Sequence, residues 1–214
     1  MKTNSVNGKV LKGMFASGTA WLEKSVPDIN AINVFPVPDG DTGTNMLLTM
    51  RSAMEEANQN LNGDASSVTK SMAHGALMGA RGNSGVILSQ FWRGLAKGLE
   101  GKNSFDGKDF ATALAEASQT AYEGIVHPVE GTMLTVLKDV AKATDTAAKV
   151  NSKSLLSILE AAVEAAGDSV AKTPSLLPVL KKAGVVDAGG QGIYVLLEGA
   201  LYYLKGEKDK IQYR

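Results

Sequence analysis

Two aspartates stand one residue apart in a loop that is rich in proline and glycine. Asp39 and Asp41 lie within residues 33–46, which have the sequence NVFPVPDGDTGTNM, and a helix is expected to begin near Gly43. In extended chain, side chains two positions apart point the same way, and the prolines of this loop favour extended geometry in the residues before them. Paired carboxylates suit Mg²⁺, which completes its shell with water and substrate phosphates. The following helix start offers N–H groups to a phosphate. The pattern thus predicts metal plus phosphate, and so a nucleotide.

Two alternatives explain the same residues without a nucleotide. Proline, aspartate and glycine are ordinary turn residues, so a plain turn fits the spacing equally well. An EF-hand calcium loop does not fit. If Asp39 held its first position, Thr44 would replace the required glycine and Met50 the bidentate glutamate.

Composition narrows the class of protein. The 214 residues include 22 basic and 22 acidic side chains, so the net charge is +0 and no basic surface for nucleic acid or membrane is indicated. The absence of cysteine excludes disulfides and thiolate sites. The N-terminus has no apolar core of signal-peptide length, and the longest apolar stretch, 193–204, is interrupted by Glu198 and too short to span a bilayer. We expect a soluble, cytoplasmic protein with no nucleic-acid partner and no transmembrane segment.

Apolar residues recur at helical spacing in one segment after another, between short breaks that contain glycine or proline. No run alternates for long enough to predict a strand. Two breaks, 27–38 and 172–174, are expected at prolines, because proline disrupts a helix interior. The sequence therefore predicts a single all-α, antiparallel bundle. The expected helices lie near 6–24, 44–60, 66–79, 84–99, 107–124, 132–149, 153–171, 175–183 and 190–205.

Three other breaks carry more glycine than a plain turn requires. Residues 79–85 (GARGNSG), 131–134 (GTML) and 187–192 (DAGGQG) each precede an expected helix. None is a Walker A or Rossmann motif, and a helix cap with close packing explains each one alone. Alternate helices of an antiparallel bundle begin at the same end. These three starts, together with the one at Gly43, would therefore converge on one pocket whose N–H groups could bind phosphate.

Taken together, these blocks resemble a known family. Residues 33–46, 79–86, 131–134 and 187–190 are similar, in this order and across essentially the whole chain, to the DhaL domain. This domain is the nucleotide-binding L domain of dihydroxyacetone kinases. The form of the first block most resembles the N-terminal domain of bacterial fatty-acid kinase.

The resemblance implies an eight-helix antiparallel barrel with the nucleotide site at one end, where ATP or ADP binds through two Mg²⁺ ions. One of the nine expected helices, 175–183, would then be additional to the barrel. Asp39 and Asp41 match two of the three metal-binding aspartates of the dihydroxyacetone kinase relatives and would carry catalysis. Asn33 is the nearest polar candidate for the third ligand. The other implied nucleotide-site residues are Thr42, Thr44, Asn45, Gly82, Asn83, Ser84, Thr132, Met133, Asp187 and Gly189.

The implied activity is transfer of the γ-phosphoryl group of ATP to the carboxylate of a fatty acid held by a separate fatty-acid-binding protein. A carboxylate is already an anion and needs no general base, so His74 and His127 are expected to be structural or surface residues. Because fatty-acid kinases are longer, residues 1–214 would be a single domain, the N-terminal part of a kinase with further domains. Two alternatives stay open: the L subunit of a dihydroxyacetone kinase, whose length this chain matches, and a non-catalytic regulatory module that holds ADP.

Overall fold

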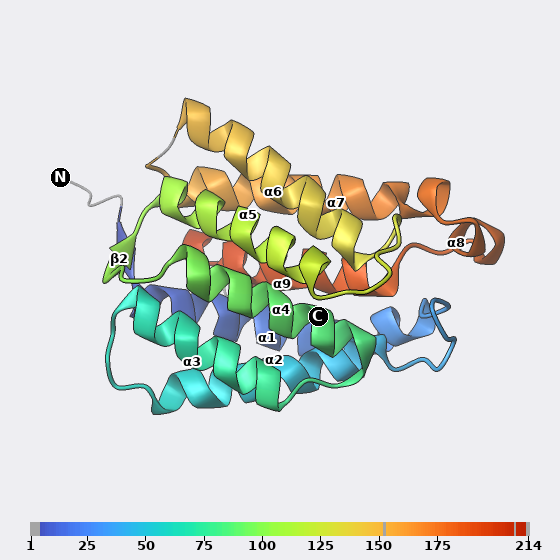
Figure 1. Ribbon diagram of the computed structural model, residues 1–214, viewed down its shortest axis with the longest axis horizontal. Coiled ribbons are helices and arrows are strands. Elements are labelled where there is room, and N and C mark those ends of the chain that lie inside the picture. The colour runs from blue at the N-terminus through green and yellow to red at the C-terminus, as the bar shows by residue number, and fades with distance from the viewer. Residues whose placement is uncertain (1–4, 152, 208, 213–214) are drawn as a thin grey trace.

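The computed structural model describes residues 5–151, 153–207 and 209–212 (Figure 1). Within these ranges the chain is almost entirely helical, which confirms the all-α prediction. Two short helices, α8 (Pro178–Ala183) and α10 (Asp209–Gln212), accompany eight long ones. The long helices are α1 (Gly8–Ala31), α2 (Thr42–Gln59), α3 (Ala65–Met78), α4 (Gly82–Gly98), α5 (Gly107–Glu123), α6 (Met133–Val150), α7 (Leu155–Leu176) and α9 (Ala188–Lys205).

The eight long helices form a closed antiparallel ring. Each one from α1 to α7 packs against the next, α7 packs against α9, and α9 returns to pack against α1 (Figure 1). The helix expected at 175–183 is the short α8, which stands outside this ring and contacts α7. As a result, α2, α4, α6 and α9 all begin at one end of the barrel, where the α1–α2 loop and α8 also lie.

Small residues allow the first and last barrel helices to pack closely. A Cβ atom built on Gly199 of α9 would lie 2.6 Å from the Cα atom of Gly18 of α1, closer than real Cβ contacts come. Inside the ring, the edge of Phe15 meets the fully buried Trp92, with ring centroids 4.6 Å apart. The indole N–H of Trp92 donates to the sulfur of Met50 at 3.2 Å. These core contacts therefore join α1, α2 and α4. The close contact between Gly18 and Gly199 joins α1 to α9 and closes the ring.

Two predicted helix ends were wrong, both at prolines. The helix expected to end at 24 continues through Pro27 to Ala31, and the one expected to end at 171 continues through Pro174 to Leu176. Proline costs one backbone hydrogen bond, but tertiary contacts hold each extension. Ile29 is fully buried beyond the first proline. Beside the second, the buried Thr173 hydroxyl accepts a hydrogen bond from the backbone N–H of Asp187 at 3.0 Å.

The start of the first predicted helix also differs. Val6–Asn7 forms strand β1, which pairs in antiparallel fashion with β2 (Ser104–Phe105). Two-residue strands are too short to produce an alternating pattern, which explains why none was predicted. Asn7 then caps α1 by accepting hydrogen bonds from the backbone amides of Lys9 and Val10.

None of the described helices combines the length and the apolar character that crossing a bilayer requires.

Candidate functional site

A cavity of about 660 Å³ opens at the end of the barrel where α2, α4, α6 and α9 begin. It brings together nearly all the residues singled out from the sequence. Thr44 alone is not among the lining residues; it is exposed, and its hydroxyl accepts a hydrogen bond from the Asn30 side chain at 3.0 Å. The predicted residues that line the cavity are Asn33, Asp39, Asp41, Thr42, Asn45, Gly82, Asn83, Ser84, Thr132, Met133, Asp187 and Gly189.

Helix capping differs between the two ends of the barrel. At the end away from the cavity, the residue preceding each of α1, α3, α5 and α7 caps it with its own side chain; these residues are Asn7, Asp64, Asp106 and Ser154. At the cavity end, the preceding residues of α2, α4 and α6 make no such bond, and only Asp187 caps its helix, α9. Side chains from outside α2 cap that helix, but the start of α4 keeps its N–H groups and a positive dipole end. The cavity is therefore the end of the barrel suited to an anion.

Asp39 and Asp41 lie at this end without partners. Asp39 is exposed and Asp41 half-buried, and within the described residues no hydrogen bond or ion pair engages either carboxylate. The lining of the cavity contains no lysine or arginine. Two unpaired carboxylates beside helix starts suited to an anion, with no lysine or arginine in the lining to balance either, form a donor set that fits Mg²⁺. No group of three or more His, Asp or Glu side chains suited to a metal occurs in the described part of the chain, so a cation here would rely on this pair.

The side chain of Asn33 already has other partners. Its Oδ1 atom accepts hydrogen bonds from the backbone amides of Asp41 at 3.1 Å and Thr42 at 3.2 Å, and its Nδ2 donates to the carbonyl of Val37 at 3.2 Å. An amide oxygen has two lone pairs, and both are used here. The geometry therefore argues against Asn33 as the third metal ligand.

A second asparagine completes the start of α2. The Oδ1 atom of Asn30 accepts hydrogen bonds from the backbone amides of Gly43 at 2.8 Å and Thr44 at 3.2 Å. Asn30 and Asn33 together occupy the backbone N–H groups at the start of α2, which the sequence pattern assigned to phosphate binding. The expectation of free amides at the start of α2 was therefore wrong, because two side chains from outside that helix cap it.

The start of α4 keeps its amides free. Within the described residues, the backbone N–H groups of Gly82, Asn83 and Ser84 have no hydrogen-bond partner. Gly82 has φ +58°, and a Cβ atom there would lie 2.5 Å from Nδ2 of Asn45. The hydroxyl of Ser84 donates to the carbonyl of Thr42 at 3.4 Å, which ties α4 to the start of α2. This helix start, placed against the aspartate loop, offers free amides of the kind that can bind a phosphate.

Asp187 is deeply buried in the wall of the cavity. Only 5% of the residue is exposed, and its Oδ2 accepts a hydrogen bond from the backbone amide of Gly190 at 2.7 Å. Burial raises its pKa to about 6, while the Gly190 and Met133 amides oppose this by favouring the charged form. The carboxylate thus caps the start of α9 while lining the cavity.

Apolar residues form the rest of the lining, and the sequence pattern did not identify most of them. They come from the aspartate loop, the first two turns of α4, the segment between α5 and α6, and the start of α6. The exposed ring of His127, expected to be a surface or structural group, also lines the cavity. Its position in the break at 126–131, at the cavity end, was the only available signal. The apolar members are Phe35, Pro36, Val37, Val86, Ile87, Ile125, Val126, Val129, Met133 and Leu134.

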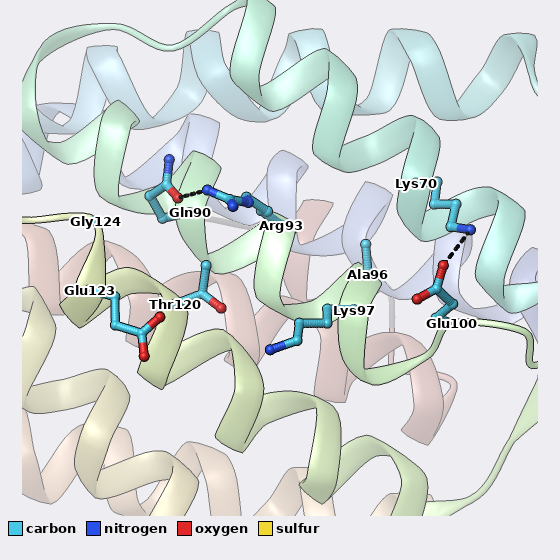
Figure 2. A pocket seen from close by; sticks show the side chains of 9 residues that line it. All are labelled: Lys70, Gln90, Arg93, Ala96, Lys97, Glu100, Thr120, Glu123 and Gly124. Atoms are coloured by element: carbon cyan, nitrogen blue, oxygen red, sulfur yellow. Dashed lines mark hydrogen bonds and ion pairs between the residues drawn. The ribbon is translucent and has the colours of Figure 1, made fainter.

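A second cavity, of about 590 Å³, shares no residue with this one and lies on the outer surface over α3, α4 and α5 (Figure 2). Its charged groups pair with neighbours: Lys70 with Glu100 at 3.0 Å, and the Arg93 guanidinium with the Gln90 carbonyl at 3.3 Å. Cations and carboxylates are mixed along it, which gives it no single charge preference. The predicted site residues all belong to the first cavity or its edge.

Comparison with known proteins identifies the family of this chain. The family model of the DAK2 domain matches residues 36–202. An uncharacterised protein of Staphylococcus epidermidis is 44% identical over 209 residues, which cover 98% of this chain and 38% of that protein. An uncharacterised protein of Staphylococcus aureus USA300 is 44% identical over 205 residues, covering 96% of this chain and 37% of that protein. The chain thus spans well under half the length of these curated relatives. It belongs to the DAK2-domain family, whose members are DhaL-type nucleotide-binding modules of kinase-related systems.

Proposed function

We propose that this chain is the ATP-binding module of a kinase that phosphorylates the carboxylate of a fatty acid presented by a separate binding protein. The observation that carries the proposal is the meeting of Asp39 and Asp41 with the uncapped start of α4 in one cavity whose lining contains no lysine or arginine. No arginine or lysine lines this cavity. Metal held by the two aspartates would therefore supply positive charge to a polyphosphate, together with the helix dipoles.

Each part of the cavity has a role in this proposal. Asp39 and Asp41 would hold two Mg²⁺ ions, which neutralise charge on the β- and γ-phosphates when bound. The amides of Gly82, Asn83 and Ser84 bind phosphate oxygens. The apolar wall, which includes Met133, takes the base together with the neighbouring Thr132, while Asp187 and Gly189 shape the last turn beside it. Thr42 and Asn45 stand between the phosphate surface and the aspartates.

Phosphoryl transfer then needs little further chemistry from the protein. A carboxylate oxygen of the acceptor forms a bond to the γ-phosphorus, the bond from that phosphorus to the β–γ bridging oxygen breaks, and ADP leaves with the electron pair. The product is an acyl phosphate. No proton has to be removed from the acceptor, so positioning and charge neutralisation are sufficient.

An alcohol acceptor such as dihydroxyacetone makes a different demand, because its hydroxyl must lose a proton. His127 is the imidazole in the cavity that could accept it, which favours dihydroxyacetone kinase as the second candidate. The third candidate is a regulatory module that holds ADP in the same cavity. It predicts that ADP stays bound and that no phosphate is transferred.

Trapping of the product separates these candidates. The chain is incubated with ATP, Mg²⁺ and hydroxylamine, and with either oleate or dihydroxyacetone. Hydroxylamine converts an acyl phosphate to a stable hydroxamate, so the proposal predicts slow oleoyl hydroxamate formation that is lost in Asp39→Ala/Asp41→Ala and retained in the matched control Asp168→Ala. Asp168 is an exposed carboxylate of α7 outside the cavity. Dihydroxyacetone phosphate as the only product would favour the second candidate. Bound ADP with neither product would favour the third.

A further inference from the structure

We propose that Asn33 is a positioning residue of the cation site: it fixes the loop that carries Asp39 and Asp41 and does not ligate the cation. The inference rests on the proposed function, since it concerns the same cation. It assigns to Asn33 a task that neither its place in the sequence nor the family match, which begins at residue 36, defines.

The hydrogen bonds of Asn33 bracket the first aspartate. Its Nδ2 donates to the carbonyl of Val37, two residues before Asp39, and its Oδ1 accepts from the amides of Asp41 and Thr42, just after it. One side chain therefore connects both arms of the loop. The orientation of the Asp39 carboxylate depends on the positions of these two arms. Asp41 is fixed by the hydrogen bond from its own backbone amide to Asn33.

The orientation of this amide is determined by its partners. Two N–H donors face one terminal atom, and a carbonyl acceptor faces the other. Exchanging oxygen and nitrogen would set donor against donor and acceptor against acceptor. Only 6% of Asn33 is exposed, so water cannot readily replace the lost bonds.

These bonds leave no free lone pair on Oδ1 for a cation. Ligation would require the amides of Asp41 and Thr42 to lose their acceptor at the point where α2 begins. Hydrogen-bond partners that orient metal ligands commonly change metal affinity by about 10–100-fold when they are substituted. A positioning role therefore predicts a large effect on cation affinity from a residue that never touches the ion.

The test is Asn33→Asp, for which the two roles predict opposite results. A ligand role predicts unchanged or tighter binding, because a carboxylate is a better Mg²⁺ or Mn²⁺ ligand than an amide. A positioning role predicts binding weakened by about tenfold or more, because the new oxygen faces the Val37 carbonyl. The readout is the free Mn²⁺ concentration, measured by electron paramagnetic resonance during titration of the chain with Mn²⁺ in the presence of ADP.

Asn60→Asp provides the matched control. Asn60 lies at the opposite end of α2 and makes a comparable set of bonds: its Nδ2 donates to the hydroxyls of Ser67 and Ser71, and its Oδ1 accepts from the amide of Asn62. The same change of amide to carboxylate there should lower the melting temperature without changing Mn²⁺ affinity. Thermal unfolding of all variants shows whether a weakened affinity reflects the site or the fold.

A second measurement covers the case in which Asn33→Asp does not fold. Broadening of the Mn²⁺ signal by ¹⁷O-labelled water reports how many waters the ion binds. Loss of a ligand in Asn33→Ala would add one water, whereas loss of a positioning residue lowers affinity with the water count unchanged. Added water, or undiminished Mn²⁺ affinity in Asn33→Asp, overturns the inference. If the wild type itself does not bind Mn²⁺ in the presence of ADP, both the proposed function and this inference are overturned. That result differs from weakened binding in a variant, so the two failures can be told apart.

Discussion

Asp187 illustrates how one residue can line a site and act mainly on the fold. Its carboxylate is buried and bonded to the first turn of α9, and burial raises its pKa from 3.8 to about 6. The sequence motif assigned it to the nucleotide. The structure shows a helix cap whose charge is costly at neutral pH, because a buried carboxylate loses more hydration than the amides of Gly190 and Met133 return.

The raised pKa predicts a specific pH dependence of stability. Because the folded state binds the Asp187 proton more tightly than the unfolded state, its contribution is complete below pH 3.8 and declines as the pH rises through about 6. A shift of this size corresponds to about 3 kcal/mol. We expect the free energy of unfolding of Asp187→Asn, measured by urea denaturation, to rise relative to wild type between pH 4 and 6.5. Parallel pH profiles of the two proteins would contradict this assignment.

At the residue scale, the sequence singled out Asp39 and Asp41 because two carboxylates one residue apart precede an expected helix start. Both line the cavity, and their metal-binding role stays a prediction. The bonds of Asn30 and Asn33 could not be predicted, since those that cap α2 join residues eight to fourteen positions apart across an irregular loop. Their effect was also the reverse of what the pattern indicated: they occupy the amides that a helix start normally leaves free.

At the scale of elements, the start of α4 supplies what the start of α2 cannot. Gly82 adopts φ +58°, which places three free amides beside Asn45 and the aspartate loop. A left-handed conformation costs a residue with a side chain about 1–2 kcal/mol, so glycine is favoured there. The exposed Gly101 has a similar φ of +73°, but nothing lies within 4 Å of a Cβ atom built on it.

These two glycines form a matched pair of substitutions. Gly82→Ala and Gly101→Ala should each lower stability by about 1 kcal/mol through backbone strain. Only Gly82→Ala should also weaken nucleotide binding, by about tenfold, because its Cβ atom would displace the Asn45 amide at 2.5 Å. Isothermal titration with ADP and Mg²⁺ and thermal unfolding measure both effects. Equal affinity of the two variants for ADP would show that the start of α4 does not take part in nucleotide binding.

Helix positions were predictable from periodicity, while some helix ends were not. Most boundaries agree with the structure to within about three residues because glycine and polar breaks separate the helices. The errors at Pro27 and Pro174 arose because a proline penalty of about 3 kcal/mol is smaller than what distant packing supplies. Ile29 and Thr173, which are fully buried beside these prolines, are anchored by other helices that a local window cannot include.

For the whole molecule, ring closure creates the site. The aspartate loop and the starts of α4, α6 and α9 are far apart in the sequence, and the ring that α9 closes against α1 brings all four together. The sequence predicted this convergence from antiparallel order alone. The apolar wall and His127 could not be predicted in this way, because their place in the cavity depends on the path of a loop.

Closure at the α1–α9 contact can be tested with two glycines. Gly199→Ala places a Cβ atom 2.6 Å from the Cα of Gly18, so overpacking should cost about 1–3 kcal/mol. Gly167→Ala, within α7, meets its nearest atom at 3.4 Å, an ordinary contact, and should stabilise the protein by about 0.5–1 kcal/mol. Melting temperatures that change in opposite directions support closure by glycine packing. A Gly199→Ala protein as stable as wild type would contradict it.

The central claim is that the cavity binds a nucleotide through a cation held by Asp39 and Asp41. The most direct measurement is isothermal titration of the chain with ATP and with ADP, with and without Mg²⁺, for wild type, Asp39→Ala/Asp41→Ala and the Asp168→Ala control. We predict Mg²⁺-dependent binding in wild type and in Asp168→Ala, and its loss in the double variant without a large change in melting temperature. Nucleotide binding by a folded double variant that equals wild type, or none by a folded wild type, would contradict the account.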